Sequence, residues 1–245
     1  MIENKQMKAH RKIAKAFGYE LIKRRKSPSS NSHLLNLISH YKIDLVLDVG
    51  ANKGQFASML RDEGYSGDIL SFEPVSTTFK VLQDKANSDS RWHAHQCALG
   101  EEIGTIDINI MESSDLSSVL SPNEFGKEKY NKIKVLDTES VPIDTIDNFL
   151  KTNKLCAKRR ILLKMDTQGF DLSVFAGART SIKNIICIQS EISLTPIYSG
   201  MPNYLDSLST YEKAGFVITG LYPISRKEDM SVIEMDCMML NKEID

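Results

Sequence analysis

Apolar residues along the chain follow two alternating patterns. Short runs that are mostly apolar on both faces are typical of strands buried within a sheet. Between them, apolar residues recur three or four positions apart, the spacing of helices with one buried face. The apolar runs occupy residues 44–49, 68–72, 161–165 and 185–190, and the helical segments occupy 55–65, 75–89, 170–178 and 203–214. This alternation predicts an α/β fold with a mostly parallel sheet.

Further segments are expected to extend this sheet or connect its parts. They are a third strand over 91–99, short strands over 105–111 and 134–139, a helix over 143–150 capped by Asp144 or Thr145, and a final antiparallel pair over 216–221 and 232–240. A long polar stretch, 112–132, lies between two of the strands. Such a loop above a sheet edge carries substrate contacts or forms a lid, and disorder is the competing interpretation.

A basic amphipathic helix is predicted near the N-terminus. Residues 7–25 place Ile13, Phe17 and Leu21 four apart among Lys and Arg, with a weak point at Gly18. Two interpretations stay open. The helix packs on the domain with its charged face in water, or it contacts an anionic membrane surface or carrier lipid.

Length and charge limit the class of protein. A chain of 245 residues usually forms one domain, or one domain with an appendage. A helix over 33–41 leads into the first strand, so we expect an N-terminal basic helical extension (residues 1–40) and one domain (residues 41–245). The formal net charge is −1, but residues 1–26 carry +7 and the remainder therefore −8. This balance gives no indication of nucleic-acid binding.

The cysteines and the absence of long apolar segments indicate the compartment. Cys97, Cys156, Cys187 and Cys237 are widely spaced, without a Cys-x-x-Cys pair or a Cys/His cluster. They predict reduced core thiols rather than a zinc site. The sequence shows neither the apolar stretch of a signal peptide nor the roughly 20 apolar residues of a membrane span. We expect a cytoplasmic protein, at the inner face of the membrane if the basic helix binds lipid.

The residues DVGANKG join the first apolar run to the next helix. A buried strand, a glycine turn and a helix N-terminus form a nucleotide-binding unit, because the backbone can approach a ligand there. Asn52 and Gln55 replace glycines of the dinucleotide fingerprint, and the carboxylate of Asp48 suits a pyrophosphate badly. It suits the ammonium, and more remotely the sulfonium, of S-adenosylmethionine (AdoMet). We predict that this cofactor binds at Asp48, Gly50, Ala51 and Asn52.

Carboxylates also follow later strands. Glu73, whose exit is fixed by Pro74, lies 25 residues after Asp48, and an acid about 20 residues after the glycine turn accepts ribose hydroxyls. Asp166 and Glu191 follow two further strands, whose carboxyl ends meet at the ligand-binding edge of such a sheet. The alternative is that some of these acids only cap helices or hold loops.

Two other positions are candidates at the same edge. Ala98 and Leu99 end the predicted third strand, where apolar contact and backbone hydrogen bonds would hold an adenine ring. His95 in that strand is a candidate base, although a histidine within a strand is more often structural.

Six segments carry a resemblance to a known family. DVGANKGQF, SFEP, the ALG with its following Gly104, VPIDTIDNFL, LLKMDTQGFDLSVFAGA and SEIS occur in this order between residues 44 and 215. Together they resemble the FkbM family of AdoMet-dependent methyltransferases. The resemblance implies a class I Rossmann-like fold, with a mostly parallel seven-stranded sheet and a terminal antiparallel pair. It also implies methyl transfer to hydroxyls of sugars, polyketides or other secondary metabolites, with S-adenosylhomocysteine as product.

The resemblance assigns residues position by position. Asp48, Gly50 and Asn52 match the first cofactor motif, Glu73 the ribose-binding acid, Ala98 and Leu99 the adenine-side segment, and Asp166 the acid after the fourth strand. Many members have glutamate where this chain has Gln168, which keeps the shape and loses the charge. A base or metal ligand at that position is therefore not expected here.

Methyl transfer to a hydroxyl requires alignment and deprotonation. The acceptor oxygen must lie in line with the methyl group at about 3 Å, and a base must take its proton or a divalent cation must lower its pKa. Asp166 is expected to orient the methionine moiety or act as base, and Glu191 to contact the acceptor or share a metal, with His95 third. The alternative is that all three only bind cofactor and proximity supplies the catalysis. No metal ligand is assigned.

Two rival functions stay open beside methyl transfer. A nicotinamide-dependent oxidoreductase would need the glycines that Asn52 and Gln55 replace. A non-catalytic binding protein on the same fold is the other, and the retained acids argue against it. The acceptor is expected to be a sugar of a glycan or glycolipid intermediate, since the basic segment suits anionic, membrane-associated intermediates. A secondary-metabolite hydroxyl is the alternative, and the oligomeric state stays open.

Overall fold

The computed structural model describes residues 5–19, 29–155 and 159–243. In chain order its elements are α1 (Lys5–Ala16), α2 (Ser30–His40), β1 (Leu45–Val49), α3 (Gln55–Asp62), β2 (Asp68–Phe72), α4 (Ser76–Ala86), β3 (Trp92–His95), β4 (Ala98–Leu99), β5 (Gly104–Met111), η1 (Ser114–Leu116), α5 (Glu124–Lys129), β6 (Val135–Asp144), α6 (Ile146–Thr152), β7 (Ile161–Met165), α7 (Asp171–Ala176), η2 (Ser181–Asn184), β8 (Ile185–Ser193), α8 (Tyr204–Lys213), β9 (Phe216–Arg226) and β10 (Val232–Asn241). Strands and helices alternate through much of the chain, as the apolar pattern predicts.

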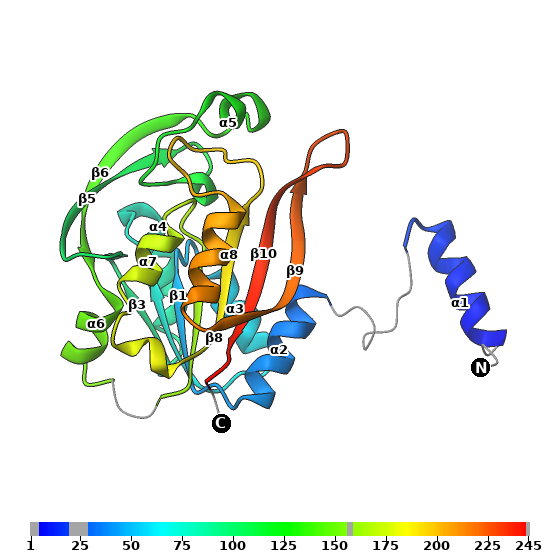
Figure 1. The fold of residues 1–245 in the computed structure, drawn as a ribbon, viewed down its shortest axis with the longest axis horizontal. Helices are drawn as coiled ribbons and strands as arrows, with labels where there is room; N and C mark the ends of the chain where they lie inside the picture. Colours follow the sequence, from blue (N-terminus) through cyan, green and yellow to red (C-terminus); the bar gives the residue numbers. More distant parts are fainter. Residues whose placement is uncertain (1–4, 20–28, 156–158, 244–245) are drawn as a thin grey trace.

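The main sheet has seven strands in the order β3-β2-β1-β7-β8-β10-β9 (Figure 1). In this sheet the neighbours β3, β2, β1, β7 and β8 pair in parallel, and β10 pairs antiparallel with both β8 and β9. The chain builds outward from β1 to β3 and then returns to place β7 on the other side of β1. Strand order therefore reverses at β1, where open α/β sheets bind ligands. The predicted fold class is confirmed, and both final strands are longer than expected.

Helices cover both faces of this sheet (Figure 1). Residues of α2, α3 and α4 build the core on one face, and residues of α6, α7 and α8 build it on the other. Leu34, Leu37 and Ile38 of α2 are buried in this core. Helix α2, which the sequence analysis placed in the N-terminal extension, therefore packs on the sheet.

A second sheet of three strands, in the order β4-β6-β5, was not predicted. In Figure 1, β5 and β6 arch past one side of the main sheet. The single strand expected over 91–99 is two strands in two sheets, because β3 ends at His95 and β4 pairs with β6. Apolar residues explain the split: Ala98, Val141 and Ile143 bury their side chains in a separate small core.

The strand expected over 134–139 is also longer than predicted. β6 continues to Asp144, so the following helix α6 begins at Ile146 instead of residue 143. Of the two proposed caps, Thr145 is the one observed. Its hydroxyl accepts a hydrogen bond from the Asn148 N–H at 3.0 Å.

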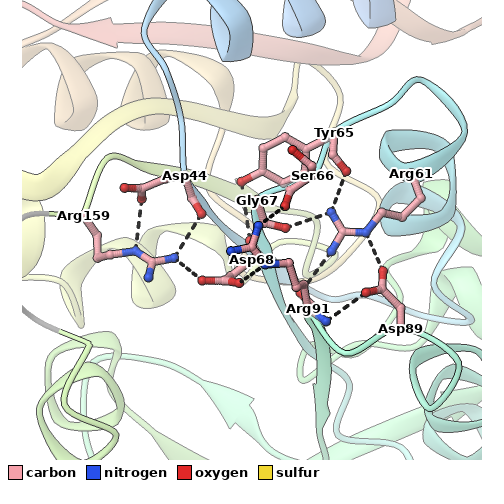
Figure 2. Close-up of polar contacts among 9 residues, drawn as sticks. All are labelled: Asp44, Arg61, Tyr65, Ser66, Gly67, Asp68, Asp89, Arg91 and Arg159. Carbon is pink, nitrogen blue, oxygen red and sulfur yellow. Dashed lines mark hydrogen bonds and ion pairs between the residues drawn. The ribbon is translucent and has the colours of Figure 1, made fainter.

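An arginine-centred network ties the amino ends of the strands together (Figure 2). The Arg61 guanidinium contacts the Asp89 carboxylate at 2.6 Å and donates to the carbonyls of Tyr65, Gly67 and Arg91 at 2.7, 2.8 and 3.0 Å. In the same network, the Arg159 guanidinium joins carboxylates at the starts of β1 and β2. The charged side chains at the amino ends of the strands are therefore engaged with one another and with backbone carbonyls. The carboxyl ends of the strands are the edge at which open α/β sheets bind ligands.

The N-terminal helix α1 covers only part of the predicted segment. Residues 20–25 of that segment and Cys156 lie outside the described residues. In the described part of the segment, Ile13 and Phe17 are exposed, at 58% and 75%.

The described cysteines, Cys97, Cys187 and Cys237, all have free thiols. Within the described ranges, none of the helices combines the length and apolarity needed to traverse a bilayer.

Candidate active site

Three neighbouring strands carry polar side chains at one level near their carboxyl ends. Asp48 of β1 lies opposite Ser71 of β2 and Lys164 of β7. The Asp48 carboxylate accepts a hydrogen bond from the Ser71 hydroxyl at 3.0 Å and pairs with the Lys164 ammonium at 3.1 Å. Burial lowers the pKa of Lys164, but the carboxylates of Asp48 and Asp166 outweigh this effect and raise it. Lys164 therefore stays charged and compensates Asp48.

This pairing places Asp48 behind the glycine turn. Lys164 also donates to the Gly50 carbonyl at 3.1 Å, and Asp48 is absent from the residues that line the two openings described below. In this structure Asp48 positions the turn through Lys164, and its direct contact with a cofactor ammonium stays a prediction.

Three residues of the turn, Gly50, Asn52 and Gly54, have left-handed backbone. Gly50 has φ +73°, and a Cβ there would lie 1.9 Å from the Asp166 carbonyl oxygen. Asn52 has φ +47°, a conformation that asparagine tolerates better than most residues. Its side chain accepts a hydrogen bond from the Ser114 hydroxyl at 3.1 Å. Asn52 can thus stand at a glycine position of the dinucleotide fingerprint.

Glu73 lies beside this turn with its carboxylate almost enclosed. Its two oxygens accept from the N–H groups of Asn52 and Val75 at 2.9 and 3.0 Å. Burial raises its pKa to about 7, although both N–H groups oppose the shift. Each oxygen keeps acceptor capacity, so this group can bind ligand hydroxyls.

A cavity opens in front of Glu73, between the glycine turn and the segment that contains Ala98 and Leu99. We call it the cofactor cavity. Apolar residues form much of its wall, namely Val49, Phe72, Val75, Leu99, Ile108 and Phe170. Pro74 and Ala98 also line it. The residues expected at the adenine side are therefore gathered in one place.

A second opening, which we call the acidic cleft, adjoins the cofactor cavity. The two share Gly50, Asn52, Asp115, Asp166 and Gln168. Its other polar lining includes Lys164, Gln189, Glu191, Glu234 and Asp236. Ala51, predicted to bind cofactor, lines this cleft instead of the cavity. Asp166 and Glu191, predicted as a pair from strand ends, do meet here.

Gln168 connects these acids. Its amide nitrogen donates to Glu191 Oε2 at 2.9 Å and to Asp166 Oδ1 at 3.2 Å, and its amide oxygen accepts from the Tyr198 hydroxyl at 3.1 Å. The pKa of Glu191 is raised well above its usual value, first by burial and then by the carboxylates of Asp166 and Glu234. A neutral donor at position 168 therefore limits repulsion within the acidic cleft.

His95 lies elsewhere. Its ring packs against Phe72 and Phe149, with centroids 5.4 and 4.8 Å away, and it lines a different opening. Burial lowers its pKa. The structure does not bring His95 to Asp166 and Glu191, because β3 ends before the chain turns into β4. Among the described residues, no three His, Cys, Asp or Glu side chains are arranged to hold a metal ion.

A comparison with protein-family models identifies the family of this chain. The model of the methyltransferase FkbM domain matches residues 48–218, well over half of the chain. The chain belongs to the FkbM methyltransferase family. It is an AdoMet-dependent methyltransferase, and the resemblance seen in the sequence is confirmed. A search of curated proteins finds no match.

Solved structures similar to this FkbM-family chain are distant. Magnesium protoporphyrin IX methyltransferase from Synechocystis PCC 6803, with bound AdoMet, has 9% identity and TM-score 0.47, over 86% of this chain and 77% of that one. An rRNA methylase from Streptococcus thermophilus has 9% identity and TM-score 0.47, over 90% and 98%. A putative tRNA (m1A22) methyltransferase from Streptococcus pneumoniae has 11% identity and TM-score 0.46, over 89% and 75%. At this distance, these similarities carry no information on the substrate.

Several polar residues at this FkbM-family site were not predicted, among them Lys164, Gln189, Tyr198, Glu234 and Asp236. Lys164 was detectable, because a lysine inside the apolar run ILLKM needs a buried partner. Tyr198, Glu234 and Asp236 come from a loop and from the last strand, where their sequence context gives no signal.

Proposed function

We propose that this methyltransferase is an O-methyltransferase whose acceptor is a hydroxyl of a sugar in a glycan or glycolipid intermediate. The supporting observation is the shared wall between the cofactor cavity and the acidic cleft. Asp166 and Gln168 face both openings. A methyl donor in the cavity and a hydroxyl in the cleft would therefore meet at Asp166.

The residues of the cofactor cavity fit AdoMet. Glu73 accepts the ribose hydroxyls, and Leu99, Ala98 and Phe170 provide apolar surface for the adenine ring. The Asp166 carboxylate, 44% exposed, offers a partner for the methionine ammonium. When bound, AdoMet supplies an electrophilic methyl group on a sulfonium.

The acidic cleft supplies the remaining chemistry. Carboxylates accept hydrogen bonds from the hydroxyls of a sugar and so orient the attacking oxygen. Glu191 is the proposed base, because a carboxylate with a raised pKa takes a hydroxyl proton more readily than an ordinary one. Gln168 holds Glu191 and Asp166 in a common orientation.

Methyl transfer from labelled AdoMet to sugars and to secondary-metabolite alcohols tests this function. We expect methylated sugar with the wild type, and loss of turnover in Glu191→Gln with AdoMet affinity kept within twofold. Glu73→Ala should weaken AdoMet binding by tenfold or more in calorimetry. Glu112→Gln, an exposed acid outside both openings, is the matched control. Methylation of the secondary-metabolite alcohols alone would contradict the sugar assignment, and AdoMet binding without turnover on any hydroxyl would contradict the activity.

We also propose that α1 contacts an anionic membrane surface. Ile13 is exposed on α1 with Lys12 and Lys15, and the exposed Phe17 directly follows the last helical residue, Ala16; apolar and basic residues together are typical of an interfacial helix. Co-sedimentation with phosphatidylserine vesicles but not with phosphatidylcholine vesicles is expected, with loss of binding in Ile13→Asp. Equal binding to both vesicles, or to neither, would contradict this contact.

A further inference from the structure

The ionisable groups that line the acidic cleft are mostly carboxyl groups. It is lined by the carboxylates of Asp115, Asp166, Glu191, Glu234 and Asp236 and by the single ammonium of Lys164. That ammonium is already engaged, since it contacts Asp48, the Gly50 carbonyl and Asp166 at 3.1, 3.1 and 3.5 Å. The cleft therefore has a surplus of negative groups.

The acids lie close together because of strand register. Glu191 of β8 faces Asp236 of β10, and Glu234 is two residues before Asp236 on the same face of β10. Glu234 accepts hydrogen bonds from the Tyr130 and Ser225 hydroxyls at 3.2 and 2.9 Å. Lys164 is the basic side chain that lines the same cleft and acts on Asp236, but it is shared with Asp48 and Asp166.

A second observation points to a ligand in the cleft. Gln189 is 9% exposed and lines the cleft, and its amide oxygen is buried without a hydrogen-bond partner. Its amide group bonds to Asp236 through the other end. A buried acceptor without a donor costs roughly 1–3 kcal/mol. Gln189 thus lacks the N–H or O–H donor that a bound molecule would provide.

We propose that the acidic cleft binds the acceptor through a protonated amine, so that the acceptor is an amino sugar with its ammonium beside Gln189 and Asp236 and its reacting hydroxyl near Glu191. This inference rests on the proposed function and narrows its substrate class. An ammonium offers three donors and a positive charge. It would satisfy the Gln189 oxygen and offset the surplus of carboxylates at once.

The same charges select against other sugars. A neutral N-acetylated sugar can donate to Gln189 but leaves the carboxylates uncompensated. A uronic acid or a sugar phosphate would bring like charge into a partly desolvated cleft, where repulsion is strong. The basic N-terminal segment had suggested anionic intermediates, but the acidic cleft excludes an anion at the reacting end of the acceptor.

Three matched probes test the proposal on the full chain with S-adenosylhomocysteine present. They are methyl α-glucosaminide, methyl N-acetyl-α-glucosaminide and methyl α-glucuronide, with affinities measured by ligand-observed NMR titration. We expect the amine to bind at least tenfold more tightly than the neutral sugar, and the glucuronide to bind most weakly. Equal affinities, a preference for the glucuronide, or no detectable binding of the amine would overturn the proposal.

Variants locate the amine. Asp236→Asn and Gln189→Leu should each remove about tenfold of the amine preference while S-adenosylhomocysteine affinity stays within twofold, and Glu112→Gln should change neither. If S-adenosylhomocysteine affinity falls with the amine affinity, the acids serve the cofactor's own ammonium and the proposal is wrong. A thermal melt confirms that each variant is folded.

The two proposals fail in different ways. Methylation of sugar hydroxyls without any preference for the amine would keep the proposed function and overturn this inference. Amine binding at the cleft without methylation of any sugar would keep the inference about the cleft and overturn the proposed function.

Discussion

Asp48 and Lys164 occupy facing positions on β1 and β7, and their charged groups lie 3.1 Å apart with side chains 0% and 8% exposed. The pair links the strand that starts the cofactor turn to the strand that carries Asp166. A buried ion pair adds little net stability, but loss of one partner leaves an uncompensated charge.

We therefore expect Lys164→Met to lower the free energy of unfolding by about 3–5 kcal/mol. The double variant Asp48→Asn/Lys164→Met should recover much of that loss, because no unpaired charge remains. Urea unfolding followed by circular dichroism measures both. A double variant less stable than Lys164→Met alone would show that the pair is not the cause.

Gly50 should tolerate no side chain. Gly50→Ala places a methyl group 1.9 Å from the Asp166 carbonyl oxygen at φ +73°, so we expect a loss of about 3 kcal/mol or more. Gly104→Ala is the control, since a Cβ there meets nothing within 4 Å, and it should change stability by less than about 0.5 kcal/mol. Similar unfolding midpoints for the two variants would contradict the close approach of the Gly50 backbone to the Asp166 carbonyl.

Glu73 should make stability depend on pH. Its pKa is about 7 in the folded chain because of burial, against 4.5 for the ordinary side chain. The folded state therefore holds the proton more tightly, and stability should fall as pH rises from about 4.5 to 7, with a slope of up to about 1.4 kcal/mol per pH unit. Glu73→Gln should show a shallower slope in urea unfolding between pH 5 and 8. The raised pKa values of Glu191 and Glu234 act in the same direction, so part of the slope should remain. An unchanged slope would mean that Glu73 is not a titrating group in this range.

Arg61 should contribute to the stability of the fold at the amino ends of the strands (Figure 2). Arg61→Lys cannot reproduce hydrogen bonds to three carbonyls and one carboxylate, and at about 1 kcal/mol per bond we expect a loss of about 2–3 kcal/mol. Arg179→Lys is the matched control, because Arg179 is 68% exposed and forms a surface ion pair with Glu101. A solvent-screened pair contributes under about 1 kcal/mol. Equal losses in differential scanning calorimetry would show that the network adds nothing beyond a surface pair.

Local patterns were enough for the main sheet. Runs such as 44–49 and 161–165 are apolar on both faces, and that property depends only on neighbouring residues, so the strands and the motif from Asp48 to Gly54 were predictable. The second sheet was not, because β4 and β6 meet over residues far apart in the chain and β4 has only the two residues Ala98 and Leu99.

The chain by itself determined the α/β fold, the glycine turn and the strand-end acids, since each rests on spacing along a few dozen residues. Tertiary structure alone decided which partners those acids contact. In the folded chain Asp48 is buried against Lys164, and His95 lies away from Asp166 and Glu191. Glu234 and Asp236 of the last strand lie beside Glu191. The reason is physical: burial and partner charges set the state of a carboxylate, and both come from segments that only folding brings together.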